Sequence, residues 1–210
     1  MMKIIECEQR SPEWYAARLG LPTASMFDAV MAQGKKGGES LTRRTYMRKL
    51  AGEIITGEPM DSYTNQHLER GVAMEPEARD FYSFMTDADL TRVGFIVNGQ
   101  KGCSPDSLIG KDGMLEIKTA LPHILIGHHL QDEFPSEHKH QCQGALWIAE
   151  REWIDIAIYW PKMPLFTKRA YREEKYIAEI ATAVEQFNSE LAAVVEFMKK
   201  KGAISQEKAA

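Results

Sequence analysis

The chain has 210 residues, of which 44% are hydrophobic, and it carries 26 Lys and Arg against 30 Asp and Glu. These values predict one globular domain, residues 1–210, with its own core. No apolar run approaches the roughly 20 residues that span a bilayer, and the N-terminus lacks the apolar stretch of a signal peptide, so we expect a cytoplasmic protein with no membrane partner. The three cysteines form no CxxC pair, which argues against a disulfide framework or a zinc cluster.

The first part of the chain is predicted to be helical. The expected helices cover residues 14–19, 23–32, 40–56 and 66–85. Ser11-Pro12-Glu13 is a typical start for the first of them, and Ser40 can cap the third, which should end before Gly57. Pro76 lies inside the fourth helix or at a kink in it.

A basic segment at residues 35–49 lies in a chain whose formal net charge is −4. Its six Lys or Arg residues face a single acid, Glu39. A run of this kind is typical of a solvated helix face. The alternative is a DNA-binding surface, because clustered cations can bind phosphates whatever the net charge of the chain.

Strand character appears in the middle of the chain. Strands are predicted at residues 93–97, 101–109, 114–118 and 153–160. Asp112-Gly113 is a good hairpin signal between the second and third of them. A helix is expected at residues 137–149. This order of elements predicts an α/β fold with a central mixed β-sheet flanked by helices.

The C-terminal segment, about residues 171–200, predicts one long amphipathic helix. Its apolar residues step by three and four in alternation: Ile177, Ile180, Val184, Phe187, Leu191, Val194 and Met198. Such a stripe favours packing against the body of the protein. An intermolecular coiled coil is the alternative, because the spacing is also that of heptads.

Two acidic residues and a lysine form the candidate chemical site. Side chains alternate along a strand, so Glu116 and Lys118 share a face, and the Asp-Gly turn brings Asp106 across from Glu116. A merely half-exposed strand is the alternative, since any one-sided strand shows this alternation. Two adjacent carboxylates repel each other, and a hard cation with oxygen ligands would neutralise them.

A cluster of four histidines raises the alternative of a transition-metal site. They are His128, His129, His138 and His140. The last two are two residues apart on a predicted helix and therefore lie on different faces, and no cysteine pair supports zinc. We therefore expect no histidine metal site.

Several short blocks occur in an order that a known nuclease family shares. They are Arg18-Leu19-Gly20 with Thr23-Ala24-Ser25, Gly71 to Arg79 (GVAMEPEAR), Cys103-Ser104-Pro105-Asp106, Glu116-Ile117-Lys118, and Gln141-Cys142-Gln143 with Trp147. Together they resemble the lambda-type phage exonucleases, which are PD-(D/E)xK nucleases of the viral recombinase type. The resemblance runs from about Trp14 to Trp160, which is most of the chain.

The resemblance implies a restriction-endonuclease-like core and a set of catalytic residues. These are Asp106, Glu116, Lys118, Glu75 and Gln143. The two carboxylates of Asp106 and Glu116, with the backbone carbonyl of Ile117, would bind the metal, and Lys118 would activate the attacking water. Without the resemblance, Glu75 is an ordinary solvated acid and Gln143 is a polar group satisfied inside the protein.

A second set of residues resembles a pocket for the 5′-terminal phosphate of DNA. It consists of Arg18, Ser25, Ser104 and Gln143. Local physics agrees, because an arginine beside the free N–H groups of a helix start attracts anions, although Arg18 could instead cap helix carbonyls.

Further DNA contacts are implied by position in the family. Leu68 matches an apolar wedge that separates the terminal base pairs, although a core position is its ordinary role. Lys35 matches a basic residue that reaches toward the duplex, and we expect Arg43 and Arg44 to contact DNA from the basic helix.

We therefore expect an Mg²⁺-dependent 5′-to-3′ exonuclease of phage-type recombination. It would act on double-stranded DNA ends, release 5′-mononucleotides and leave a 3′ single-stranded overhang. The resemblance implies two Mg²⁺ ions per site with Mn²⁺ able to substitute, a ring-shaped homotrimer, a single-strand annealing protein as partner, and a phage or prophage origin in a bacterial host. Two alternatives remain: a structure-specific endonuclease or resolvase on the same core, and a DNA-binding subunit with an inert nuclease site.

Overall fold

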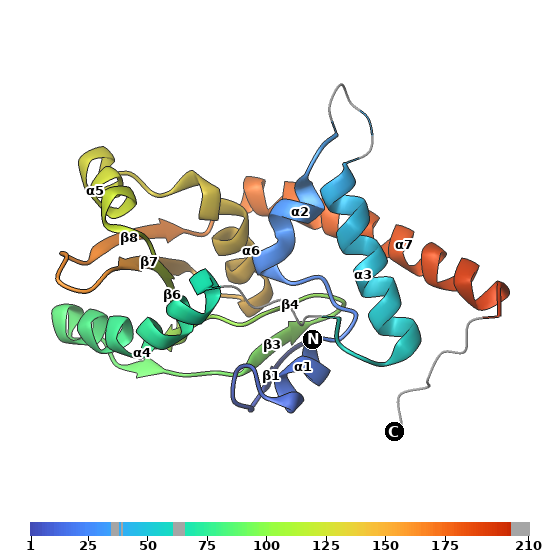
Figure 1. Cartoon of the computed structure of the whole chain (residues 1–210), viewed down its shortest axis with the longest axis horizontal. Coiled ribbons are helices and arrows are strands. Elements are labelled where there is room, and N and C mark those ends of the chain that lie inside the picture. Colours follow the sequence, from blue (N-terminus) through green and yellow to red (C-terminus); the bar gives the residue numbers. More distant parts are fainter. Residues whose placement is uncertain (35–37, 39, 61–65, 203–210) are drawn as a thin grey trace.

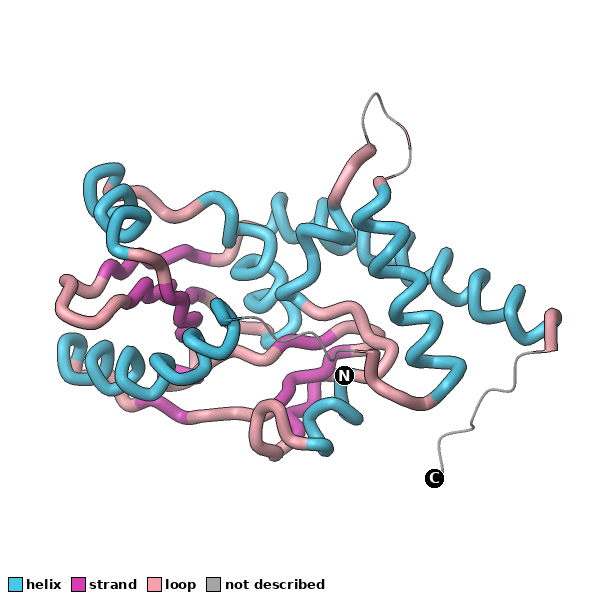
Figure 2. The backbone as a smooth tube through the Cα atoms, in the orientation of Figure 1, coloured by secondary structure: helices cyan, strands magenta, loops and turns pink. Residues whose placement is uncertain are grey.

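The computed structural model describes residues 1–34, 38, 40–60 and 66–202, and its strands form two sheets. The smaller sheet has the order β1 (Met2–Ile5), β3 (Phe95–Asn98), β4 (Gly102–Cys103). The larger has the order β2 (Leu90–Thr91), β5 (Ser107–Ile109), β6 (Gly113–Thr119), β7 (Trp153–Tyr159), β8 (Phe166–Tyr171). Strands β6 and β7 are parallel, and the other ladder pairs of the larger sheet are antiparallel. The expected mixed sheet flanked by helices is therefore confirmed (Figure 2).

The helices surround these sheets (Figure 1). In chain order they are α1 (Pro12–Arg18), α2 (Phe27–Met31), α3 (Leu41–Thr56), α4 (Gln66–Thr86), α5 (Pro122–Gln131), α6 (Lys139–Ala149) and α7 (Glu174–Lys200). Helix α3 begins and ends as the sequence predicts. The Ser40 hydroxyl accepts a hydrogen bond from the backbone N–H of Arg43 at 3.3 Å, and Gly57 ends the helix at a φ of 72°. Helix α4 continues through Pro76.

The predicted hairpin places the candidate site at the centre of the larger sheet. Ile109 pairs with Gly113 in the antiparallel ladder of β5 and β6, and the turn lies between them. On its other side β6 pairs in parallel with β7 along its whole length, from Gly113 to Thr119. Strand β6 is thus held from both edges, which gives its side chains a rigid support.

The two faces of the larger sheet are covered by different helices. Helix α4 covers one face, where Ala78 and Tyr82 pack against Leu115 and Ile117 of β6. Helices α5 and α6 lie on the opposite face, where buried residues of α6 pack with Met114. Because side chains alternate along a strand, Glu116 and Lys118 point toward the α6 side, away from α4.

Helix α7 packs against the protein's own body, as the sequence favours. Its buried residues are Ile177, Ile180, Val184, Phe187, Leu191 and Val195, and it contacts α2, α3 and α6. The apolar stripe departs from the expected one near the end, where Val195 is buried and Met198 is 40% exposed. Those last turns extend past the body of the protein (Figure 1). No helix in the described part of the chain is both long and apolar enough to cross a membrane.

Four strands or helices of this fold were not predicted: β1, α5, β8 and the two-residue edge strand β2. Strands β1 and β8 lie at sheet edges and have mixed burial, so neither has a continuous apolar run. Helix α5 (PHILIGHHLQ) buries only Leu125 and contains Gly127, which weakens its helical pattern. Asp132 then ends it in the left-handed conformation, at a φ of 52°.

Gly144 allows a test of how α6 packs against α2. A methyl group added at Gly144 would lie 2.3 Å from Cδ2 of Phe27, a fully buried ring on α2. Gly144→Ala should therefore lower the free energy of unfolding by about 1–3 kcal/mol, although alanine is favoured in helices by about 1 kcal/mol. Urea unfolding followed by circular dichroism measures this difference.

Gly127 in α5 provides the matched control, since a methyl group added there has no atom within 4 Å. Gly127→Ala should raise the free energy of unfolding by up to about 1 kcal/mol, the helical preference alone. If Gly144→Ala proves as stable as Gly127→Ala, the packing of α6 on α2 differs from that described.

Candidate active site

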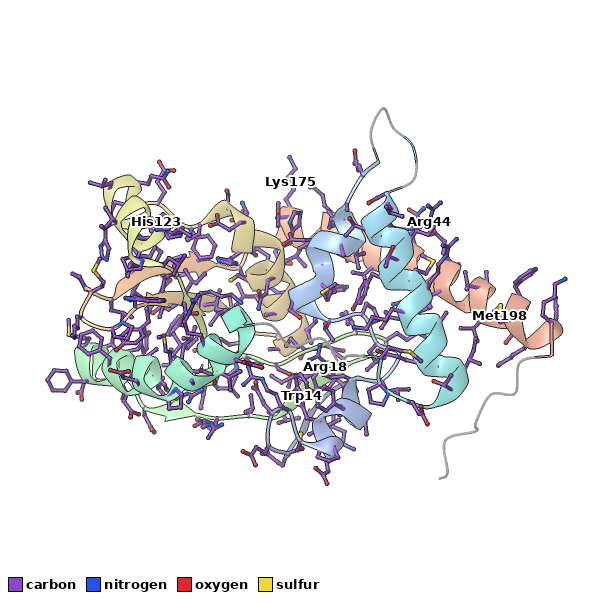
Figure 3. The ribbon with its side chains drawn as sticks, viewed as in Figure 1. Trp14, Arg18, Arg44, His123, Lys175 and Met198 are labelled. Atoms are coloured by element: carbon purple, nitrogen blue, oxygen red, sulfur yellow. The ribbon has the colours of Figure 1, made fainter. Side chains whose placement is uncertain are left out.

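One cavity of about 580 Å³ is lined by residues of the two main groups that the sequence singles out. Residues from both predicted sets line it: Asp106, Glu116 and Lys118, and Arg18, Ser25 and Ser104. They come from β6, from the segment that joins β4 to β5, from α1 and from the turn that follows α1. Figure 3 labels Trp14 and Arg18, which extend from α1 toward this region. The carboxylates and the arginine, far apart in sequence, thus share one space.

Asp106 lies across from Glu116 because the hairpin register continues beyond β5. The backbone N–H of Asp106 donates to the carbonyl of Leu115 at 3.1 Å, and Ser107 pairs with Leu115. The side chain of Asp106 accepts a hydrogen bond at 2.5 Å from the backbone N–H of Ile117. The expected juxtaposition of the two carboxylates is therefore present, and Glu116 is only 6% exposed.

Lys118 and Gln141 complete the polar group around Glu116. The ammonium of Lys118 donates to Glu116 Oε1 at 2.7 Å and to Gln141 Oε1 at 3.1 Å. The amide of Gln141 donates to the same Glu116 oxygen at 2.5 Å. Helix α6 delivers Gln141 to the cavity, so packing of α6 on the sheet fixes this triangle of side chains.

Burial and mutual repulsion disturb the titration of these groups. Burial, followed by the charges of Glu116 and Glu75, holds the pKa of Asp106 well above its usual value. Burial acts to lower the pKa of Lys118, but Glu116 and Asp106 outweigh it and raise that pKa above the ordinary lysine value. Lys118 therefore stays charged while Asp106 resists ionisation, which indicates that the site has too few positive charges for its acids.

The residues present suit a hard divalent cation that also keeps water ligands. Asp106 and Glu116 offer carboxylate oxygens, and the backbone N–H of Ile117 points to the β5 edge of β6. Because the N–H and C=O of one strand residue point to the same edge, the Ile117 carbonyl faces that edge too. In the part of the chain that the structure describes, no three His, Cys, Asp or Glu form a ready metal cage. Two carboxylates with a carbonyl fit Mg²⁺, which usually keeps several waters.

Glu75 reaches the edge of this site from α4. It forms a short ion pair with Arg79, one helical turn on, and a longer one of 3.8 Å with Arg10, which lines the cavity. Arg79 also donates to Ser107 Oγ at 3.2 Å and to the Asp106 carbonyl at 3.4 Å. The buried Arg79 thus connects Glu75 to the backbone that carries Asp106.

The residues predicted to bind the 5′-terminal phosphate lie around Trp14. Its indole N–H donates to Ser104 Oγ at 2.8 Å, and the guanidinium of Arg18 lies 4.0 Å from the centre of its ring. The hydroxyls of Thr23 and Ser25 are 3.3 Å apart on the adjacent turn. The Trp14 ring therefore holds one hydroxyl and one guanidinium beside each other, a contact that sequence reasoning missed.

The helix that should begin at residue 23 is shorter than expected. Residues Ala24–Met26 form a 3-10 turn, and the α-helix after it has only five residues. The macrodipole of so short an element is small, because it sums over few peptide units. Side chains such as Arg18, Ser25 and Ser104, more than a helix terminus, are the groups here that can bind a phosphate.

Gln143 does not face the cavity, which corrects the expectation from the sequence. It is fully buried on the other side of α6, where its amide donates to the carbonyl of Tyr171 and accepts from the N–H of Glu173. Gln141, two residues earlier, is the glutamine of α6 that faces the cavity, where its amide donates to Glu116. The two amides differ by about 200° around a helix of 3.6 residues per turn, so only one of them can point inward.

The basic helix also differs from the expected DNA-facing surface. Arg43 is 2.5 Å from Glu190 of α7 and lies over the ring of Phe187, so its charge is engaged inside the protein. Arg44 is half-buried on the same helix, and Figure 3 shows it well away from Trp14 and Arg18. Lys35 lies outside the described residues. Leu68 is in the first turn of α4, and its side chain also lies outside those described.

Comparison with known proteins places these features in a family. A model described as the YqaJ-like viral recombinase domain matches residues 13–152. The chain is 33% identical to an alkaline exonuclease (LHK-Exo) from Laribacter hongkongensis, with a TM-score of 0.82 over 92% of this chain and 98% of that chain. The structure of LHK-Exo in complex with dAMP gives 34% identity and a TM-score of 0.83 over the same shares.

A more distant structure shares the fold with this chain. A phage-related exonuclease from Haemophilus somnus 129PT is 12% identical, with a TM-score of 0.65 over 85% of this chain and 96% of that chain. The comparison with curated proteins found no match. The likeness to LHK-Exo reaches well beyond the cavity, since it includes nearly all of that chain.

Neutralising Asp106 should separate two effects of its charge: the loss of folding stability and the binding of a metal ion. In EDTA at mildly alkaline pH, Asp106→Asn should raise the melting temperature, because an acid whose pKa is raised by folding destabilises the fold once it ionises. Adding Mg²⁺ should raise the melting temperature of the parent but not that of Asp106→Asn, because the bound ion stabilises the folded parent by about 2.7 kcal/mol at 100 times the dissociation constant. Differential scanning calorimetry with and without Mg²⁺ measures both effects.

The matched control is Asp112→Asn in the β5–β6 turn, which removes an exposed acid of the same hairpin. It should respond to Mg²⁺ as the parent does. A parent that is indifferent to Mg²⁺, or an Asp106→Asn protein that keeps the full response, would contradict a metal site at Asp106.

Proposed function

We propose that this chain, which belongs to the YqaJ-like viral recombinase domain family and is a phage-type exonuclease, uses Mg²⁺ to digest double-stranded DNA from its 5′ ends. The observation that carries the proposal is the shared cavity. It combines an acidic pair with a lysine on β6 and an arginine with a serine around Trp14. The first group suits hydrolysis of a phosphodiester, and the second suits the binding of a terminal phosphate.

Each residue of the acidic group has a role in this proposal. Asp106, Glu116 and the Ile117 carbonyl would hold Mg²⁺, with Mn²⁺ able to substitute, and Glu75 is the further carboxylate that would support a second ion. A divalent cation there would lower the pKa of water and stabilise the leaving oxygen. Lys118, held by Glu116 and Gln141, would orient the attacking water and offset the charge that develops on the phosphate.

The direction of digestion follows from which end the protein can hold. A 5′-terminal phosphate carries more charge than an internal phosphodiester, and Arg18 with the hydroxyls of Ser25 and Ser104 can recognise it by charge-assisted hydrogen bonds. Cutting the next phosphodiester would release a 5′-mononucleotide and leave a 3′ overhang. The similar LHK-Exo binds dAMP in its crystal structure, which supports a mononucleotide product.

The assembly and the partner belong to the same proposal. Large apolar side chains are exposed on α4 and α5 (Phe84, Met85 and Leu130) and near the end of α7 (Phe197 and Met198). These two regions lie at opposite ends of the protein (Figure 1). Two different patches at opposite ends fit a head-to-tail interface, the kind that closes a ring such as a homotrimer. A single-strand annealing protein would then use the 3′ overhang in recombination.

A structure-specific endonuclease on the same core is the rival within nucleases. It would need the acidic group on β6 but would have no use for a terminal-phosphate pocket beside it. A DNA-binding subunit with an inert site is a third reading, and the complete set of Asp106, Glu116 and Lys118 argues against it. These three readings differ in what happens to DNA that has no end.

Digestion of linear and closed circular DNA tests the proposed function. With Mg²⁺, the parent should digest an end-labelled linear duplex and leave a closed circle of the same sequence intact, and EDTA should stop the digestion. Lys118→Ala should digest the linear duplex at least about 100-fold more slowly, because it lacks the cation where charge develops. Cleavage of the circle would favour the endonuclease, and inert but DNA-bound protein would favour the third reading.

The terminal phosphate supplies a second prediction. The parent should digest duplexes with a 5′-phosphate faster than those with a 5′-hydroxyl, and Arg18→Ala should lose most of that preference, because it removes the guanidinium of the pocket. Initial rates on the paired substrates measure the preference. Arg48→Ala is the matched control, since it removes an exposed arginine of α3 outside the cavity. Equal rates for the parent, or a full preference in Arg18→Ala, would count against end recognition.

A further inference from the structure

The loop between β1 and α1 is fixed to the candidate site, although none of its residues was predicted to belong to that site. The side-chain amide of Gln9 donates to the carbonyl of Pro105 at 3.0 Å and to the carbonyl of Val93 at 2.9 Å. The backbone N–H of Ser11 donates to the carbonyl of Glu8 at 3.1 Å and closes the turn. Because Pro105 directly precedes Asp106, this loop has a defined position relative to the metal-binding carboxylates.

Arg10, at the tip of this turn, occupies a backbone conformation that disfavours it. Its φ is 71°, in the left-handed region where glycine fits without strain and a long side chain is uncommon. Three of the other non-glycine residues with positive φ in the described part of the chain, at positions 87, 132 and 150, directly follow a helix, where that conformation is usual. Arg10 does not follow a helix; it is the third residue of the turn Glu8–Ser11, a position of positive φ that glycine fits best, and its side chain lines the active-site cavity.

The surroundings of Arg10 leave its charge open to a substrate. Its side chain is 41% exposed, and its pairing with Glu75 is loose, at 3.8 Å. Glu75 already has a close ion pair with the buried Arg79, which is itself hydrogen-bonded to Ser107 and the Asp106 carbonyl. The fold therefore does not need Arg10 to neutralise Glu75, and a guanidinium in a cavity of this kind favours a phosphate.

Arg10 and Arg18 lie on either side of α1. Arg10 precedes the helix and Arg18 is its last residue, so roughly 10 Å of helix separates them. Arg18 belongs with Trp14 and Ser104, whereas Arg10 is beside Glu75. Both residues line the cavity that contains Asp106 and Glu116. A DNA strand that crosses this cavity would therefore meet a guanidinium at each end of α1.

We propose that Arg10 binds an internal phosphodiester of the digested strand, on the 3′ side of the bond that is cut, while Arg18 holds the 5′ end. This inference rests on the proposed function of the same site. It gives Arg10 a role that differs from that of Arg18: it contributes to binding every duplex equally, whatever group the 5′ end carries. It also explains why arginine occupies a turn position where glycine would be less strained.

Replacement of Arg10 by glycine tests this role without harming the fold. Arg10→Gly relieves the left-handed strain, so the variant should melt no lower than the parent. Its KM for a 5′-phosphorylated duplex with Mg²⁺ should rise on the order of 10-fold, the value of one charge-assisted contact. The slope of log kcat/KM against log salt should become shallower by about 0.9, the loss of one phosphate contact. Its preference for a 5′-phosphate should stay that of the parent.

Lys162→Gly is the matched control. Lys162 is also a cation at positive φ, at 67°, but it lies in the turn between β7 and β8 and does not line the cavity. This variant should keep the KM and the salt slope of the parent. Arg10→Lys should recover most of the salt slope, because it restores the charge. Arg10→Asn, which also tolerates the left-handed conformation, should repeat the result of Arg10→Gly.

Two results would overturn the inference. If Arg10→Gly lowers kcat and the affinity for Mg²⁺ but leaves KM and the salt slope unchanged, Arg10 only positions Glu75. If it behaves like Lys162→Gly in every measurement, Arg10 does not contact DNA. A parent that digests no DNA end with Mg²⁺ is a different outcome, which refutes the proposed function itself.

Discussion

Mutual repulsion between the carboxylates of Asp106 and Glu116 sets the conditions that the surrounding structure has to meet. The β5–β6 register brings them together, and one backbone N–H and one lysine offset only part of their charge. Burial makes the imbalance stronger, which is why the pKa of Asp106 is held well above its usual value. A site that stores this much unbalanced negative charge favours a divalent cation, and the rigid central position of β6 prevents the carboxylates from moving apart.

The helices around β6 each supply different side chains to the site. Helix α4 covers one face of the sheet and brings Glu75 and Arg79 to the edge of the site, while α6 on the other face brings Gln141 to Glu116. Helix α1 stands beside them with Trp14, whose ring holds both Arg18 and Ser104. The acidic group and the proposed phosphate-binding group are thus built from separate elements and meet in one cavity.

Local patterns in the sequence were enough for the hairpin and for the pairing of Asp106 with Glu116. The turn signal and the alternation of side chains along a strand determine that register, and both can be seen within about a dozen consecutive residues. The choice between Gln141 and Gln143 could not be made in this way. Both amides lie in the same short block, and the side of α6 that faces β6 depends on tertiary packing, such as the contact of Gly144 with Phe27. Arg43 was misjudged for a similar reason, since its partner Glu190 is 147 residues away.

The proposed chemistry of this site requires a divalent cation bound between Asp106 and Glu116. Crystals of the protein soaked in Mn²⁺, with diffraction recorded near the manganese absorption edge, locate that ion by its anomalous scattering. We expect a peak at coordination distance from a carboxylate oxygen of each residue and from the carbonyl of Ile117, absent from crystals of Asp106→Asn treated in the same way. Two results would contradict a metal site at these carboxylates. One is a protein that digests DNA with Mn²⁺ but binds the ion elsewhere, and the other is an Asp106→Asn variant that binds the ion as well as the parent does.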